Sequence, residues 1–142
     1  MSLLMMPDNT MFYKSPNKIY GYKAFKSDWT CLGTQYYCPG EFQSMHFVKL
    51  CRHGMHFCRR LDDVFKYYGP DLNQIHIAEV EAFGDVEEGP DKCCTNGLRI
   101  IRELDANEIL WKLEDRSAAK YIAWRSGIHN KFTYFSQQFQ SP

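Results

Sequence analysis

The segment Ile75 to Val86, IHIAEVEAFGDV, constrains the fold of this chain more than any other part of the sequence. Apolar side chains recur at nearly every second position, which is the period of a β-strand. The polar set between them, His76, Glu79 and Glu81, is expected to face water, as it would on a half-buried strand. Because a lone strand or hairpin is at best marginally stable in water, other segments must supply partner strands.

Several short segments have the composition of such partners. IYGYKAF alternates and is rich in aromatic residues, which favours a strand. Gly33 and the pair Pro39-Gly40 bracket another candidate, as expected for a hairpin or meander. CCTNGLRIIREL is expected to pair with the segment from Ile75 to Val86. The predicted partner strands are residues 19–25, 34–38, 44–50 and 93–104.

Two segments have helical spacing. Residues 61–68, LDDVFKYY, repeat apolar side chains at helical intervals and stop at Gly69-Pro70. A longer helical segment is predicted from an Asp105 cap to Gly127. Its expected apolar face comprises Ile109, Leu110, Leu113, Ala118, Tyr121, Ile122 and Trp124. Strands followed by helices predict a single α+β domain with a mainly antiparallel sheet, one intervening short helix and C-terminal helices.

The domain organisation follows from length and composition. A chain of 142 residues is the usual size of one domain. Residues 1–17 are polar and punctuated by proline, so we expect a flexible arm there. Residues 18–127 are expected to form the single domain, and residues 128–142 a C-terminal tail.

Charge and cysteine content bear on partners and location. The 17 basic residues balance the 17 acidic ones, so no overall field attracts nucleic acid or a membrane. No apolar run reaches the roughly 20 residues of a membrane span, and no export signal is recognised at the start. We therefore expect a cytoplasmic protein, in the host cell if it is viral, whose six cysteines are free thiols.

The stretch CRHGMHFCRR, residues 51–60, concentrates reactive side chains. A zinc ion would use Cys51, His53, His56 and Cys58. The cysteines are seven residues apart, whereas structural zinc sites use pairs two to four residues apart. The alternative is a strand, a Gly54 turn and an entry into the next helix, with the cysteines packed inward.

The sequence also leaves two catalytic interpretations open, a cysteine nucleophile and a pair of acid–base carboxylates. A neighbouring His or Arg lowers the pKa of a thiol, so Cys51 or Cys58 could be a nucleophile. Glu79 and Glu81 share one strand face, which suits acid–base chemistry, although such pairs are more often simply solvated. The candidate catalytic residues are His56, Cys58 and Glu81.

The arginines of the same stretch could bind a ligand. Arg52, Arg59 and Arg60 could hold a phosphate at the start of the helix that follows. The alternative is that they pair with Asp62 and Asp63. The candidate binding residues are Arg52, His53, His56, Arg59, Arg60 and Tyr22.

Several blocks together resemble a known family. These blocks are YKAF, TCLGTQY, the segment from Cys51 to Tyr68, AEVEAFGDV and DKCCTNGLRIIREL. They resemble a domain of unknown function found in phages, prophages and bacteria, over residues 20–104. The sequence departs from that pattern at Met55, where relatives more often carry an aromatic residue, and in its C-terminal helices. The resemblance implies a viral or mobile-element origin and no assigned activity.

The order of elements is also weakly similar to ADP-ribosyltransferase-like folds. That similarity implies an NAD pocket containing His56, Tyr22 and Glu81, but the expected His or Arg on the first strand is absent. Fold-level analogy is a weak guide to function.

We therefore expect a small binding domain that contacts a protein partner, without catalysis and without a cofactor. An NAD-binding enzyme and a zinc-stabilised module are the alternatives.

Overall fold

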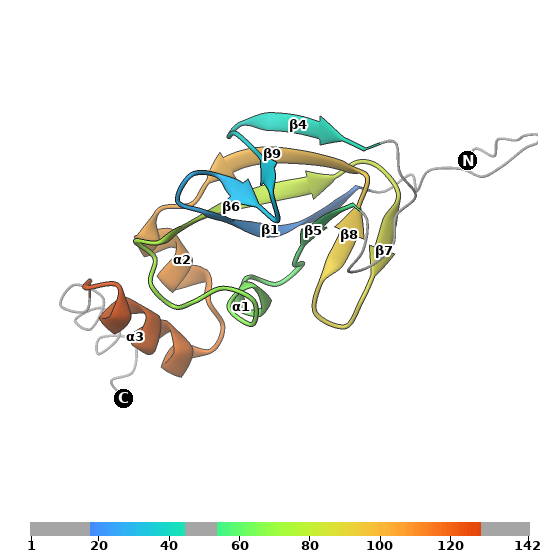
Figure 1. The fold of residues 1–142 in the computed structure, drawn as a ribbon. Helices are drawn as coiled ribbons and strands as arrows, with labels where there is room; N and C mark the ends of the chain where they lie inside the picture. The colour runs from blue at the N-terminus through green and yellow to red at the C-terminus, as the bar shows by residue number, and fades with distance from the viewer. Residues whose placement is uncertain (1–17, 45–53, 129–142) are drawn as a thin grey trace, which may run out of the picture.

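The computed structural model describes residues 18–44 and 54–128 (Figure 1). Its largest element is a four-stranded antiparallel sheet in the order β1-β6-β9-β4. These strands are β1 (Ile19–Lys26), β6 (Ile75–Ala82), β9 (Gly97–Glu103) and β4 (Gly40–Gln43). The molecule is thus an α+β domain built on an antiparallel sheet. The strands predicted over residues 19–25 and 75–86 are confirmed in β1 and β6, although the second ends at Ala82.

Two smaller sheets account for the other strands of the described residues. A hairpin pairs β2 (Thr30–Cys31) with β3 (Thr34–Gln35), and a three-stranded sheet has the order β5-β8-β7. Its strands are β5 (Met55–Phe57), β8 (Cys93–Thr95) and β7 (Val86–Glu88). The predicted single strand over residues 93–104 is wrong in this respect, because β8 and β9 join different sheets. β9 pairs with β6 as expected.

The helices are shorter than the sequence predicts. They are α1 (Leu61–Val64), α2 (Ala106–Lys112) and α3 (Arg116–Arg125). The predicted helix over residues 61–68 is α-helical only in its first half. The predicted continuous helix from Asp105 to Gly127 is broken between α2 and α3, where Leu113 adopts an extended backbone and Asp115 caps α3. The predicted Asp105 cap is confirmed, and it forms a capping box with Glu108.

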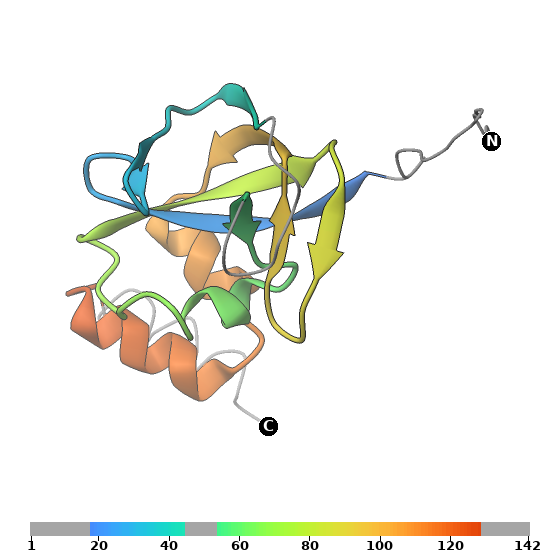
Figure 2. The ribbon, with the colours of Figure 1, turned by 45° about the vertical axis from the view of Figure 1, so that its right-hand side comes forward.

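Both faces of the main sheet are packed. The helices lie together below β1 and β6 in both ribbon views (Figures 1 and 2). Adjacent β1 residues Ala24 and Phe25 belong to different apolar clusters, as do Ile77 and Ala78 on β6. The first cluster includes residues of the three helices, and the second includes residues of β2, β5 and β8.

Cross-strand contacts correct the prediction for the polar face of β6, where Glu81 lies opposite Tyr20 of β1 and Arg99 of β9. Glu81 was expected to face water, but it is 3% exposed. Its carboxylate pairs with Arg99 at 3.3 Å and with Lys18 at 3.5 Å, which neutralises its buried charge. On α3, Tyr121 and Trp124, predicted to lie on the apolar face, are exposed, whereas Ala119, Ile122 and Ala123 are buried.

The strand predicted over residues 44–50 falls almost wholly outside the described residues. The same holds for Cys51, Arg52 and His53.

Candidate functional site

A pocket of about 310 Å³ lies where β1, β2, β5 and α1 meet. This volume is at the lower end of the range for small-molecule sites. Its apolar wall includes Ala24, Phe57 and Val64. The polar residues that line it are Tyr22, Lys23, Cys31, His56, Cys58, Tyr67, Tyr68 and Lys92. Three residues that the sequence singled out, Tyr22, His56 and Cys58, therefore share one pocket.

A close contact between β1 and β5 builds this pocket. Tyr22 and Cys58 exchange two backbone hydrogen bonds, of 2.7 and 2.8 Å. The neighbouring Gly21 permits this approach, because a Cβ atom there would lie 2.3 Å from the carbonyl oxygen of Cys58. The contact places the His56 backbone beside the side chain of Lys23.

Lys23 is the most unusual residue of the pocket. It is 4% exposed, on a central stretch of β1 opposite Ala78. Its ammonium or amine nitrogen donates to the His56 carbonyl oxygen at 2.5 Å and lies 3.5 Å from Cys31 Sγ. Burial lowers the pKa of Lys23, and the nearby Cys31 thiol opposes this effect. Within the described part of the chain, Lys23 forms no ion pair with a carboxylate.

Two aromatic rings lie near the same nitrogen. Lys23 Nζ lies 5.4 Å from the ring centre of Tyr36 and 5.7 Å from that of Phe25. These distances permit cation–π attraction to the charged form. The rings supply no full negative charge, so burial remains the largest influence on the pKa of Lys23.

Cys31 connects Lys23 to Tyr68. Cys31 Sγ lies 3.1 Å from the Tyr68 hydroxyl, and either atom can donate. Burial, followed by the contact with Cys31, raises the pKa of Tyr68, so its hydroxyl keeps its proton at neutral pH. Lys23, Cys31 and Tyr68 therefore form a continuous chain of polar contacts in the pocket wall.

His56 and Cys58 differ from what a catalytic dyad requires. Burial, then the positive charges of Lys23 and Lys92, lowers the pKa of His56. Burial, then the carboxylates of Asp63 and Asp91, raises the pKa of Cys58 to about 12. Because the thiolate is the nucleophile, a thiol with this pKa is poorly activated.

Lys92 contributes a second cation to the pocket. Its Nζ lies 4.9 Å from the ring centre of Tyr67, whose hydroxyl donates to Asp91 at 2.5 Å. Among residues 18–44 and 54–128, Lys92 has no carboxylate partner, and no Asp or Glu lines the pocket. The lining therefore combines apolar surface, two lysines and a histidine.

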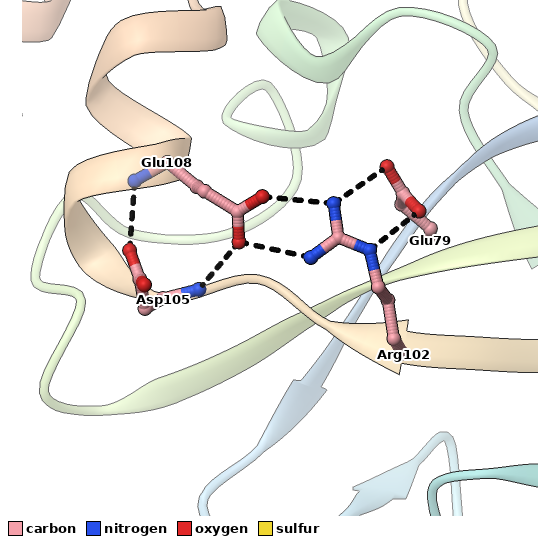
Figure 3. Close-up of polar contacts among 4 residues, drawn as sticks. All are labelled: Glu79, Arg102, Asp105 and Glu108. Atoms are coloured by element: carbon pink, nitrogen blue, oxygen red, sulfur yellow. Dashed lines mark hydrogen bonds and ion pairs between the residues drawn. The ribbon is translucent and has the colours of Figure 1, made fainter.

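The carboxylates of β6 lie outside this pocket and are already paired. Glu79 binds the Arg102 guanidinium at 3.0 and 3.3 Å, and the same guanidinium binds Glu108 at 3.0 and 2.8 Å (Figure 3). Glu108 in turn completes the capping box of α2 with Asp105 (Figure 3). This network fastens α2 to the sheet. Glu81 is held by Arg99 and Lys18, as described above.

The two described arginines of the CRHGMHFCRR stretch pair with glutamates. Arg59 binds Glu88 at 2.6 Å and Arg60 binds Glu114 at 2.5 Å, both at the surface. The predicted partner Asp62 instead accepts hydrogen bonds from the backbone N–H groups of residues 114 and 115, each at 2.9 Å. Asp63 pairs with Lys66 at 3.2 Å.

Two of the four predicted zinc ligands, Cys51 and His53, lie outside the described residues. Within the described ranges, no three His, Cys, Asp or Glu side chains come together closely enough to hold a metal ion. The five cysteines described form no disulfide bond with one another.

Reasoning from sequence missed Lys23, Lys92 and Tyr68 as site residues. A signal for Lys23 was present in YGYKAF, where Gly21, Lys23 and Phe25 share one strand face. A lysine on the face of a core phenylalanine is unusual, because lysine is rarely buried without a partner. Lys92 and Tyr68 reach the pocket through tertiary contacts that no local pattern reveals.

The fold and the pocket thus define an antiparallel α+β domain with an internal lysine. The chain belongs to a family described as a domain of unknown function, DUF7666, which matches residues 19–112. This range includes all of the described residues that line the pocket. Neither a curated protein nor a solved structure matches the chain. No helix in the described ranges is both long and apolar enough to cross a membrane.

Proposed function

We propose that this protein is a non-catalytic binding domain and that its pocket holds an organic anion, with the apolar part of the ligand inside. The observation that carries the proposal is Lys23, a buried amine without a carboxylate partner among the described residues. Burying a charged group is costly unless an opposite charge accompanies it. A ligand carboxylate would supply the negative charge that the described residues do not place beside Lys23.

The other lining residues support the same chemistry. Lys92 and His56 add positive or hydrogen-bonding groups, whereas Phe57, Ala24 and Val64 offer apolar surface. Apolar walls with a few placed polar groups are typical of ligand sites. An aromatic or branched aliphatic carboxylate combines both requirements in a molecule of suitable size.

The protein partner expected from the sequence would be recognised by the same chemistry. A carboxylate beside an apolar group occurs in free organic acids and also at the C-terminus of a chain that ends in an aromatic residue. Both sources would use the same pocket. A free acid and a short peptide with a C-terminal phenylalanine therefore form the two arms of the test.

A matched pair of probes tests the charge requirement. Benzoate and benzamide share one ring and differ in charge, and each is titrated into the labelled protein while backbone NMR signals are followed. We expect benzoate to shift the signals of Ala24, Phe57 and Val64 at lower concentration than benzamide does. The peptide is compared with its C-terminal amide in the same way.

Two lysine variants provide the controls. Lys92→Met should weaken benzoate binding, because it removes a cation from the pocket. Lys26→Met removes an exposed lysine of the same strand, outside the pocket, and should leave binding unchanged. Equal affinity for benzoate and benzamide, or shifts confined to another surface, would contradict the proposal.

No observation favours the two alternatives to the same degree. The ADP-ribosyltransferase-like hypothesis requires Tyr22, His56 and Glu81 in one pocket, and Glu81 does not line it. The zinc hypothesis depends in part on residues outside the described ranges. The phage or prophage origin and the cytoplasmic location stay predictions.

A further inference from the structure

The amine of Lys23 has the surroundings of a reactive lysine as well as those of an anion-binding one. Desolvation in an apolar pocket is a recognised way to make a lysine nucleophilic, because it favours the neutral amine with its free electron pair. Lys23 Nζ lies 5.4 Å from the ring centre of Tyr36 and 5.7 Å from that of Phe25, and the residue lines the pocket. When Lys23 reacts as the neutral amine it no longer pairs with the ligand's anionic group, and Lys92, which lines the same pocket, would hold that group instead.

We propose that Lys23 captures a carbonyl group of the ligand as a Schiff base, so that the natural ligand is an aldehyde or ketone carrying an anionic group. This inference rests on the proposed function, because the same pocket must first bind the ligand. It adds the substrate class and a covalent, stoichiometric step. The step is reversible and needs no oxidant or reductant.

The atoms of this step balance within the pocket. The electron pair of Lys23 Nζ adds to the carbonyl carbon, and a proton from nitrogen moves to the carbonyl oxygen to give a carbinolamine. The carbinolamine then loses its hydroxyl and the remaining N–H proton as water, and a C=N bond forms. One amine and one carbonyl compound thus give one imine and one water.

The chain of polar contacts from Lys23 through Cys31 to Tyr68 suits these proton movements. The Cys31 thiol lies 3.5 Å from Lys23 Nζ, and the Tyr68 hydroxyl lies 3.1 Å from Cys31 Sγ. Both groups can donate or accept a hydrogen bond. The His56 carbonyl oxygen accepts one N–H of the amine at 2.5 Å and fixes the position of the nitrogen.

Reductive trapping tests the inference on the full chain. The protein is incubated at neutral pH with 4-carboxybenzaldehyde and sodium cyanoborohydride, which converts an imine irreversibly into a secondary amine. We expect one carboxybenzyl group per chain, located on Lys23 by peptide mass spectrometry. Excess benzoate, which fits the proposed pocket but has no aldehyde, should suppress the labelling.

Mapping in the wild-type protein makes the test independent of any variant's folding, and exposed Lys26 serves as the internal comparison. Lys23→Arg, which retains a cation but forms no imine, should lose the adduct. Labelling of Lys26 and other exposed lysines with Lys23 untouched would overturn the inference. If benzoate still binds in that case, the proposed function stands, and if benzoate also fails to bind, both proposals fall.

Discussion

At the scale of single residues, Lys23 sets the chemistry of the pocket. A buried lysine normally loses more by desolvation than it gains by packing. The cost of desolvating its nitrogen is offset in part by the His56 carbonyl oxygen, the Cys31 sulfur and two aromatic rings. These groups are weaker partners than a carboxylate. Residues that sacrifice stability in this way are common at functional sites.

This burial predicts a pH-dependent stability. The pKa of Lys23 is lowered in the folded protein, while the unfolded chain titrates near the ordinary value of 10.5. Between the two values the unfolded state binds more protons, so stability due to this group rises with pH across that interval. The free energy of unfolding of the wild type, minus that of Lys23→Met, should therefore increase from neutral pH towards pH 10.5.

Urea unfolding at a series of pH values measures this difference. Lys26→Met controls for the general effect of removing one lysine. A wild-type minus Lys23→Met difference that stays flat or falls over the alkaline range would show that Lys23 is not held with a lowered pKa.

Residue patterns predicted part of the site. The sequence singled out His56 and Cys58 because unusual side chains cluster in CRHGMHFCRR, and Tyr22 through the similarity to ADP-ribosyltransferase-like folds. All three line one pocket. It could not anticipate that Asp63 and Asp91 would act on Cys58, since the three come together only in the fold. Lys23 was overlooked because a single lysine among aromatics looks like an ordinary strand residue.

At the scale of secondary structure elements, the contact between β1 and β5 positions the pocket. A methyl group at residue 21 would meet the Cys58 carbonyl oxygen, a backbone atom that cannot move aside without breaking the bridge. We expect Gly21→Ala to lower the free energy of unfolding by about 1–3 kcal/mol, the usual cost of overpacking.

Gly69→Ala is the matched control for this variant. A Cβ atom at residue 69 meets no atom within 4 Å, so its effect should stay within about 0.5 kcal/mol. Chemical denaturation of both variants measures the comparison. Equal stability of the two would mean that the close approach of β5 to β1 is absent.

The break between α2 and α3 shows why helix lengths were predicted less well than helix positions. Asp115 caps α3 by accepting from Ala118 N–H at 3.1 Å, which is a local signal. The break is also held from a distance by the Asp62 carboxylate, which accepts from the two N–H groups just before α3. Local periodicity contains no information about such a tertiary contact.

The network of Glu79, Arg102 and Glu108 predicts an acid-sensitive attachment of α2. The hydrogen bond from Arg102 holds the pKa of Glu108 below its ordinary value of 4.5. A lowered folded-state pKa contributes stability above pH 4.5, and this contribution is lost as pH falls through the folded-state value. A double-mutant cycle of Arg102→Met and Glu108→Gln should therefore show favourable coupling at neutral pH that disappears in acid.

Unfolding curves of the four proteins in the cycle, recorded across the acidic range, provide the measurement. Coupling that persists unchanged at low pH would contradict this role for the Glu108 charge.

At the scale of the whole molecule, the pocket lies where the two apolar clusters meet. Cys58 and Val64 belong to the cluster between the main sheet and the helices, whereas Cys31 and Phe57 belong to the cluster between the main sheet and the smaller sheets. Tyr68 packs against both. A ligand in the pocket would contact both clusters, so its binding should stabilise the domain as a unit.

The antiparallel α+β class could be predicted because most strands and helices leave a local pattern. The assignment of strands to three sheets could not, because β8 and β9 are nearly continuous in sequence and are separated at Asn96. The Asn96 side chain accepts a hydrogen bond from the backbone N–H of Asp85 at 2.9 Å, which helps to fix the chain where it passes from one sheet to the other. Burial of Lys23 follows from that assignment, because β5 of the three-stranded sheet packs against β1 and its His56 carbonyl oxygen contacts the lysine.

The most direct test of the central claim is the titration of the Lys23 amine itself, followed by NMR in protein labelled at lysine, without and with saturating benzoate. Burial without a countercharge predicts a pKa below 10.5 in the free protein. A bound carboxylate favours the charged form and should raise that pKa. An amine that titrates at or above 10.5 without ligand, or that does not respond to benzoate, would contradict the claim that the pocket is built for an anion.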